Sequence, residues 1–180
     1  MTKKGQIVEI PASSPIYSTE LPIFHSKKEE LIWKSLKKEY SLFNGFLVGE
    51  HHGTQDFKLG QRKGINVGGK KAPLYVIAID ELDNRIFVGA GEDHAGLFSD
   101  CFHYSNNQIE WVSEKNNLEI LLQNGISVEI ESSAFEDRFD AKLYIFDNDF
   151  FLEFEKPISI TIQNYLIEVF YQDSLIIKIQ

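Results

Sequence analysis

The residues best suited to chemistry lie between Lys58 and Lys71, in a stretch that is basic, rich in glycine and free of acidic residues. Closely spaced glycines let another molecule approach the backbone, and lysine and arginine side chains bind phosphate oxygens. These features favour a loop that contacts phosphate groups. The alternative is a solvated hairpin that carries ordinary surface lysines. The basic residues of the stretch are Lys58, Arg62, Lys63, Lys70 and Lys71.

The stretch lacks the phosphate loop of nucleoside triphosphate-binding proteins, whose spacing is G-x-x-x-x-G-K-[ST]. Just before it, His51 and His52 suggest a metal site. Neighbouring residues of a strand point to opposite faces, however, and a metal would need further ligands from elsewhere in the chain. We therefore expect no metal at the two histidines.

Asp93 and His94, with Asp100 and His103 close by in the chain, are residue types used in acid–base catalysis. Glycines on both sides of Asp93 and His94 mark a turn between strands. We expect a structural role for these four residues.

A cluster of acidic residues further along suggests calcium, but it lacks the D-x-[DN]-x-[DN]-G pattern of a calcium loop. We interpret it as a solvated strand edge that resists pairing with another chain. The cluster comprises Glu131, Glu136, Asp137 and Asp140.

Cys101 is the single cysteine, which excludes an intramolecular disulfide and a multi-thiolate zinc site. It lies among apolar neighbours on an expected strand. We expect a buried structural thiol and a reducing, cytoplasmic setting.

One helix is expected near the start of the chain. Ser26 and Glu29 have the spacing of a capping box. Ile32, Leu36 and Tyr40 then repeat every four residues, and Asn44-Gly45 ends the segment. Much of the chain after Gly45 alternates between apolar and polar residues, as in Ile126, Val128 and Ile130, which predicts strands with one solvated face.

Turn residues separate several of these expected strands. They predict hairpins at Asp83-Asn84, at Asn124-Gly125 and at residues 147–149. No window is long and apolar enough for a membrane span, and no signal peptide follows Met1.

Several motifs together resemble one family. They are Gly-Glu-His-His-Gly (49–53), Gly-Gln-Arg-Lys-Gly-Ile-Asn-Val-Gly-Gly (60–69), Pro73-Leu74-Tyr75-Val76-Ile77 and Asp93-His94-Ala95-Gly96-Leu97. In order and spacing they are similar to the bacterial tRNA-specific 2-thiouridylases, in the part that follows the catalytic domain. The resemblance implies a mainly β fold: a small central domain with one helix (1–92), then a six-stranded antiparallel barrel of the elongation-factor-like kind (93–180).

The resemblance also implies contact with tRNA, through Gln61, Arg62 and Lys63 with help from Lys70 and Lys71. The family's catalytic cysteines and its S-G-G-x-D-S loop for ATP are absent from these 180 residues. The chain then has no catalytic residue and no cofactor of its own. Its expected partners are tRNA and a separate ATP pyrophosphatase-domain protein that carries the chemistry, with no membrane.

Three alternatives remain open, and the uneven charge helps to separate them. Residues 1–71 hold 12 basic and 7 acidic residues, whereas residues 72–180 hold 6 and 20. Where the family has a basic strand, this chain has 131–134, Glu-Ser-Ser-Ala. The chain is therefore a tRNA-binding accessory module, a degenerate paralogue whose acidic barrel binds a protein, or a piece of a complete 2-thiouridylase.

Overall fold

The structure is a computed structural model that describes residues 4–18, 20–36, 38–112 and 123–180. The described residues form two compact units. Unit 1 contains the described residues of 4–22 and 38–98, together with Ser159–Thr161. Unit 2 contains Ile23–Leu36, the described residues of Ser99–Ile158, and Ile162–Gln180. The division into domains at residue 92 stays a prediction.

Unit 1 is built on a four-stranded mixed sheet in the order β2-β1-β4-β3. β1 lies in the middle, antiparallel to β2 and parallel to β4, and β3 and β4 form a hairpin. The strands are β1 (Gly5–Glu9), β2 (Phe46–His51), β3 (Leu74–Asp80) and β4 (Arg85–Ala90).

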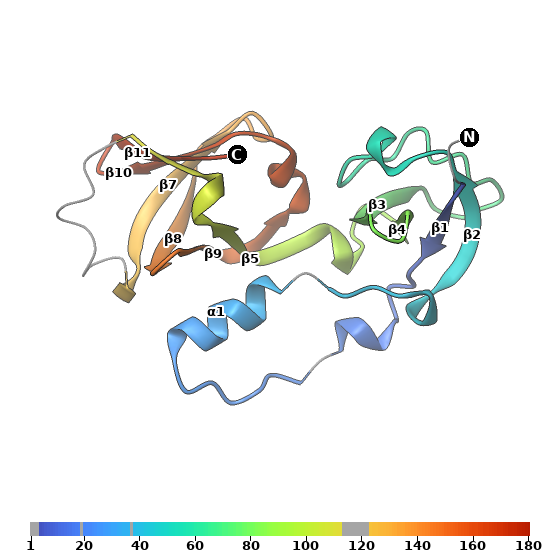
Figure 1. The fold of residues 1–180 in the computed structure, drawn as a ribbon, viewed down its shortest axis with the longest axis horizontal. Coiled ribbons are helices and arrows are strands. Elements are labelled where there is room, and N and C mark those ends of the chain that lie inside the picture. The colour runs from blue at the N-terminus through green and yellow to red at the C-terminus, as the bar shows by residue number, and fades with distance from the viewer. Residues whose placement is uncertain (1–3, 19, 37, 113–122) are drawn as a thin grey trace. The chain divides into compact units, whose positions relative to one another are not determined.

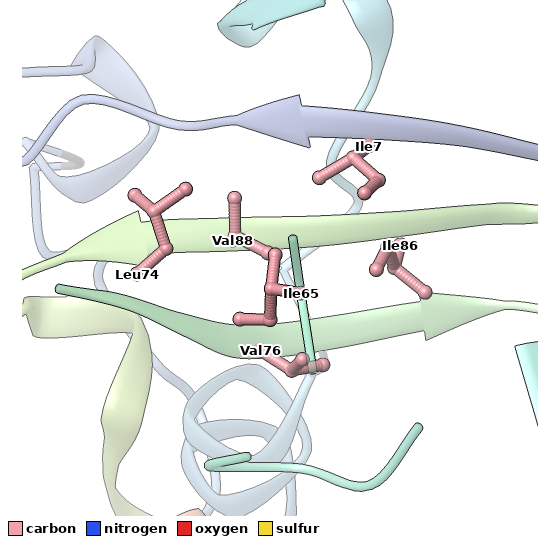
Figure 2. Packing of buried hydrophobic residues seen from close by; sticks show 6 residues of the cluster. All are labelled: Ile7, Ile65, Leu74, Val76, Ile86 and Val88. Atoms are coloured by element: carbon pink, nitrogen blue, oxygen red, sulfur yellow. The ribbon is translucent and has the colours of Figure 1, made fainter. Parts of the chain in front are cut away.

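One hydrophobic cluster of unit 1 packs on one face of this sheet. It contains aliphatic side chains from β1, β3 and β4 and one from the long segment between β2 and β3. Figure 2 shows this last side chain, Ile65, close to those of the strands. The cluster comprises Ile7, Ile65, Leu74, Val76, Ile86 and Val88.

His94 connects two distant segments of unit 1. Its side chain is 2% exposed, and its Nδ1 accepts a hydrogen bond from the Gly96 N–H at 3.1 Å. Its Nε2 lies 2.9 Å from the carbonyl oxygen of Ile10 and therefore carries the proton of the neutral ring. The expected structural role of His94 agrees with this geometry.

Unit 2 is built on a seven-stranded antiparallel sheet that curls into a half-barrel, in the order β5-β9-β8-β7-β10-β11-β6 (Figure 1). The mainly β fold with one α-helix among the described residues is confirmed, with seven strands where six were expected. The strands are β5 (Phe98–Ser105), β6 (Ile109–Trp111), β7 (Ile126–Ser132), β8 (Phe139–Phe146), β9 (Asp149–Ser159), β10 (Ile167–Tyr171) and β11 (Ser174–Ile179).

The helix α1 (Lys27–Ser35) begins where the sequence predicts, because the Ser26 side chain accepts a hydrogen bond from the Glu29 N–H. It ends earlier than predicted, and Leu36 already has a non-helical backbone. The apolar residues that repeat every four positions in the sequence do not all lie in the same unit. Ile32 belongs to unit 2, whereas Tyr40 belongs to unit 1, where its ring packs against Phe87.

α1 covers one face of the unit 2 sheet. Leu31 is fully buried against Cys101, Tyr144 and Phe151. The alternating pattern predicts that Glu153 on β9 is solvated. Because α1 covers it, its side chain is only 14% exposed. Its Oε1 accepts hydrogen bonds from Lys27 at 2.9 Å and Lys34 at 2.8 Å.

Glu30 on α1 completes this ionic cluster of Lys27, Glu30, Lys34 and Glu153 by pairing with both lysines. Burial raises the pKa of Glu153, but the hydrogen bonds from Lys34 and Lys27 together outweigh burial, and the net pKa is lowered. Glu153 is therefore ionised at neutral pH and binds α1 to β9.

Two of the three predicted hairpins are confirmed. Asp83-Asn84 joins β3 to β4, and residues 147–149 join β8 to β9, with Phe146 opposite Asp149. The third prediction, at Asn124-Gly125, lies outside the described residues, because its first strand would fall within residues 113–122. The described part of the chain contains no helix able to span a membrane.

We predict that the stability of unit 1 falls as the pH drops below about 6.5. Burial lowers the pKa of His94 from 6.5, although the Ile10 carbonyl and the nearby Asp93 and Glu9 oppose this shift. The unfolded chain then binds the extra proton first, so stability is full above 6.5 and is lost as the pH falls through the folded-state pKa. Urea midpoints measured from pH 7.5 to 5 should decline in the wild type. The decline should be smaller in His94→Gln, and an equal decline in both proteins would contradict the assignment.

We also predict that Glu153→Ala destabilises unit 2 by about 2 kcal/mol, because it removes two charge-assisted hydrogen bonds from a largely buried site. Glu155 is exposed on the same strand, so Glu155→Ala should change stability by less than about 0.5 kcal/mol. Urea unfolding monitored by circular dichroism measures both. Equal effects of the two variants would show that the ionic cluster does not stabilise α1.

Candidate nucleic-acid interface

The cationic loop, defined as residues 58–71, starts from a fixed connection to β3. The N–H of Gly60 donates to the Val76 carbonyl at 2.7 Å, and the N–H of Val76 donates to the Gln61 carbonyl at 2.9 Å. Gly60 and Gly64, which frame the central Gln-Arg-Lys, both have positive φ, of 75° and 82°. Most side chains disfavour this conformation, so glycine is needed at both ends of the turn.

The Gln61 side chain shapes this turn from inside. Its Oε1 accepts a hydrogen bond from the Lys58 N–H at 2.9 Å, and its Nε2 donates to the Lys63 carbonyl at 2.9 Å. Both ends of the amide are thus engaged within the loop. Gln61 therefore orients its neighbours, a role that the sequence does not distinguish from direct contact with tRNA.

The rest of the cationic loop is held against unit 1 by apolar side chains. Ile65 is 5% exposed and belongs to the core, and Val67 packs against that core from the edge. After the loop, the Pro73 carbonyl accepts a hydrogen bond from the Gly91 N–H at 2.9 Å. The loop is thus fixed at its start, in its middle and at its end.

The charged side chains of the loop differ in their surroundings. Arg62, Lys63 and Lys71 are exposed, and none of them has an acidic side chain within 4.0 Å in the described parts of the chain. Lys58, which is not among the expected tRNA contacts, is likewise exposed and has no acidic partner in the described parts of the chain. Its position in a stretch without acidic residues could have added it to the expected contacts. Lys70 differs, because it forms an ion pair with Glu9.

A hollow of about 410 Å³ opens beside the loop. Arg62 and Lys71 lie on its wall, and the buried side chains of Ile65 and Leu74 contribute an apolar surface. Cations held on a fixed loop beside a hollow of mixed polar and apolar lining suit a phosphate ester, because the preformed arrangement reduces the entropy lost on binding.

The other residue types that could do chemistry have different environments. His51, the last residue of β2, is buried and accepts a hydrogen bond from the Gly53 N–H, whereas His52 lies just beyond the strand and is exposed. His103 instead bonds Asp149 at 2.9 Å, in unit 2. No group of three or more potential metal-ligating side chains occurs within the residues that the structure describes.

Cys101 is a buried thiol, as expected. It is 1% exposed, and its Sγ lies 3.8 Å from the Leu31 carbonyl oxygen. Burial raises the pKa of this thiol to about 12. It is therefore protonated at neutral pH and is a poor nucleophile.

Comparison with known proteins connects this geometry to a family. The protein-family model of the tRNA methyl transferase PRC-barrel domain matches residues 36–90. This range contains most of unit 1, including the cationic loop. A tRNA-specific 2-thiouridylase from Flavobacterium johnsoniae is 33% identical over 97% of this chain and 44% of its own length. The chain resembles the tRNA-specific 2-thiouridylase family.

Further 2-thiouridylases give a similar result. The protein from Christiangramia forsetii is 34% identical over 87% of this chain and 39% of its own length. The one from Karelsulcia muelleri is 36% identical over 86% and 37%. The chain thus spans less than half the length of these relatives and resembles their central and C-terminal domains.

We predict that Gln61→Met loosens the cationic loop while unit 1 stays folded. Methionine fills a similar volume but makes neither hydrogen bond. Losing the bond from the Lys58 N–H, worth about 1 kcal/mol, should speed exchange of that amide about fivefold. Gln55 is exposed in the same unit, so Gln55→Met is the matched control and should leave the exchange of Lys58 unchanged. Unchanged exchange in Gln61→Met would mean that Gln61 does not shape the loop.

Proposed function

We propose that this chain is a tRNA-binding module of tRNA wobble-uridine 2-thiolation, and that it contacts tRNA through the cationic loop. The single observation that carries the proposal is the set of exposed, unpaired Arg62, Lys63 and Lys71 on a loop fixed to the unit 1 core. The names of the relatives support tRNA as the nucleic acid.

The contacts are to phosphate and sugar. The loop presents cations and backbone, whereas base recognition in RNA usually relies on stacking and on hydrogen bonds to base edges. No aromatic residue occurs between Lys58 and Lys71. The loop therefore positions the RNA. In this proposal the ATP-dependent activation and the sulfur transfer belong to an ATP pyrophosphatase domain outside these 180 residues.

Binding of a basic protein by unit 2 is the second candidate function. A hollow of about 510 Å³ in this unit is lined by four carboxylates, and its one arginine, Arg138, already pairs with Glu131. The carboxylates are Glu131, Glu136, Asp137 and Glu168. If this were the only function, tRNA would not bind with a measurable dependence on salt.

We predict that tRNA binding weakens with salt and depends on the cationic loop. Each phosphate contact contributes about 0.7 to 0.9 to the slope of log affinity against log salt concentration, so Arg62→Ala/Lys63→Ala should lower the slope by about 1.5. At low salt the affinity should fall at least tenfold. Filter binding or fluorescence anisotropy with bulk tRNA, from 50 to 300 mM salt (roughly the range in which phosphate contacts are lost), measures both quantities.

Lys142→Ala/Lys156→Ala is the matched control, because it removes the same charge from two exposed, unpaired lysines of unit 2. This variant should bind tRNA like the wild type. If this variant lost as much tRNA affinity as the loop variant, the effect would be due to net charge alone. Absence of salt-dependent binding in the wild type would reject the proposed function.

A further inference from the structure

The hollow beside the cationic loop combines two kinds of surface within unit 1. Arg62 and Lys71 supply positive charge, and Ile65 and Leu74 are among the apolar residues that line it. Its volume of about 410 Å³ lies within the range of about 300 to 1,000 Å³ that is usual for small-molecule sites. The remaining lining residues are Gly64, Asn66, Val67, Gly69, Lys70, Ala72 and Pro73.

Two of the three cations that line the hollow have no acidic partner among the described residues. Lys70 is compensated by Glu9, but Arg62 and Lys71 face no carboxylate within 4.0 Å in the described parts of the chain. Two uncompensated cations beside one hollow attract an anion.

Gly68 does not itself line the hollow, but it lies in the chain between two residues that do, Val67 and Gly69, and gives a second observation. A Cβ added at Gly68 would have no heavy atom within 4 Å, and the φ of Gly68 lies outside the left-handed region. Neither sterics nor backbone conformation in the free protein requires glycine there. At Gly49 and Gly60, by contrast, an added Cβ would contact Val67 or Thr161 closely. A small residue at 68 leaves room for something outside the chain.

We propose that this hollow is a subsite for one nucleotide unit of the bound RNA. The phosphate lies by Arg62 and Lys71, and the ribose lies against the apolar lining of the hollow, beside the open space at Gly68. This inference deepens the proposed function and rests on it. It adds an occupant of defined chemistry, a ribose phosphate, and a contact made by shape as well as by charge.

The decisive experiment enlarges residue 68 without changing charge. Gly68→Ala should weaken the binding of bulk tRNA about threefold and Gly68→Val at least tenfold, with the salt slope of the wild type. Both variants should keep the wild-type urea midpoint, because the added atoms point into open space. Lys71→Ala should weaken binding and also lower the salt slope by about 0.7 to 0.9.

Ser127→Val, at an exposed position of unit 2, is the control for adding a branched side chain. It should leave tRNA binding unchanged. If Gly68→Val binds like the wild type while Arg62→Ala/Lys63→Ala binds weakly, the subsite is overturned and the proposed function stands. If the wild type does not bind tRNA with salt dependence, the proposed function fails and the subsite fails with it.

If Gly68→Val lowers the urea midpoint, the subsite can still be tested by NMR on the wild-type protein. Amide resonances of Gly64, Gly68 and Gly69 in the wild type should shift when tRNA is added, and Gly125 of unit 2 should not. Shifts confined to residues outside the hollow would overturn the subsite.

Discussion

The burial of Ile65 is the contact on which the cationic loop depends. It is the one buried residue between Lys58 and Lys71, in a segment whose other side chains are exposed or half-buried. Burying an isoleucine contributes about 1.5 to 3 kcal/mol. That gain offsets part of the mutual repulsion of the nearby cations and part of the entropy lost in ordering the segment. The hollow, which Ile65 helps to line, depends on the chain being held at this point.

The structure divides the basic residues into two groups with different roles. Lys27, Lys28 and Lys34 of α1 all pair with carboxylates of unit 2, and Lys4 pairs with Glu50 in unit 1. These charges are used in folding. Of the seven cations in the described parts of the chain that have no acidic partner within 4.0 Å, four lie in the cationic loop. The positive balance of residues 1–71 therefore overstates the charge available to a polyanion, and the available part is local.

Features set by neighbours in the sequence could be predicted, and features set by distant contacts could not. The Ser26 cap and the hairpin at Asp83-Asn84 depend on a few adjacent residues. The cover over Glu153 depends on a helix more than a hundred residues earlier, which no alternation pattern reveals. The basic, glycine-rich loop was identifiable from composition and from the family motif. The internal role of Gln61 and the ion pair of Lys70 with Glu9 could not be predicted from the sequence. The partners of Gln61 are backbone groups, and Glu9 lies far from Lys70 in the chain.

The two units are interleaved along the chain. α1 belongs to unit 2, although most of unit 1 follows it in the sequence, and its buried contacts Cys101 and Phe151 come much later. An isolated helix of nine residues is barely stable in water. During synthesis α1 is therefore not stabilised, and Leu31 stays exposed, until its partners in unit 2 have been made. The unit 1 sheet can form earlier, once β4 has been synthesised. For the same reason a recombination that exchanged residues 99–180 alone would have to supply a new sheet that fits the old helix.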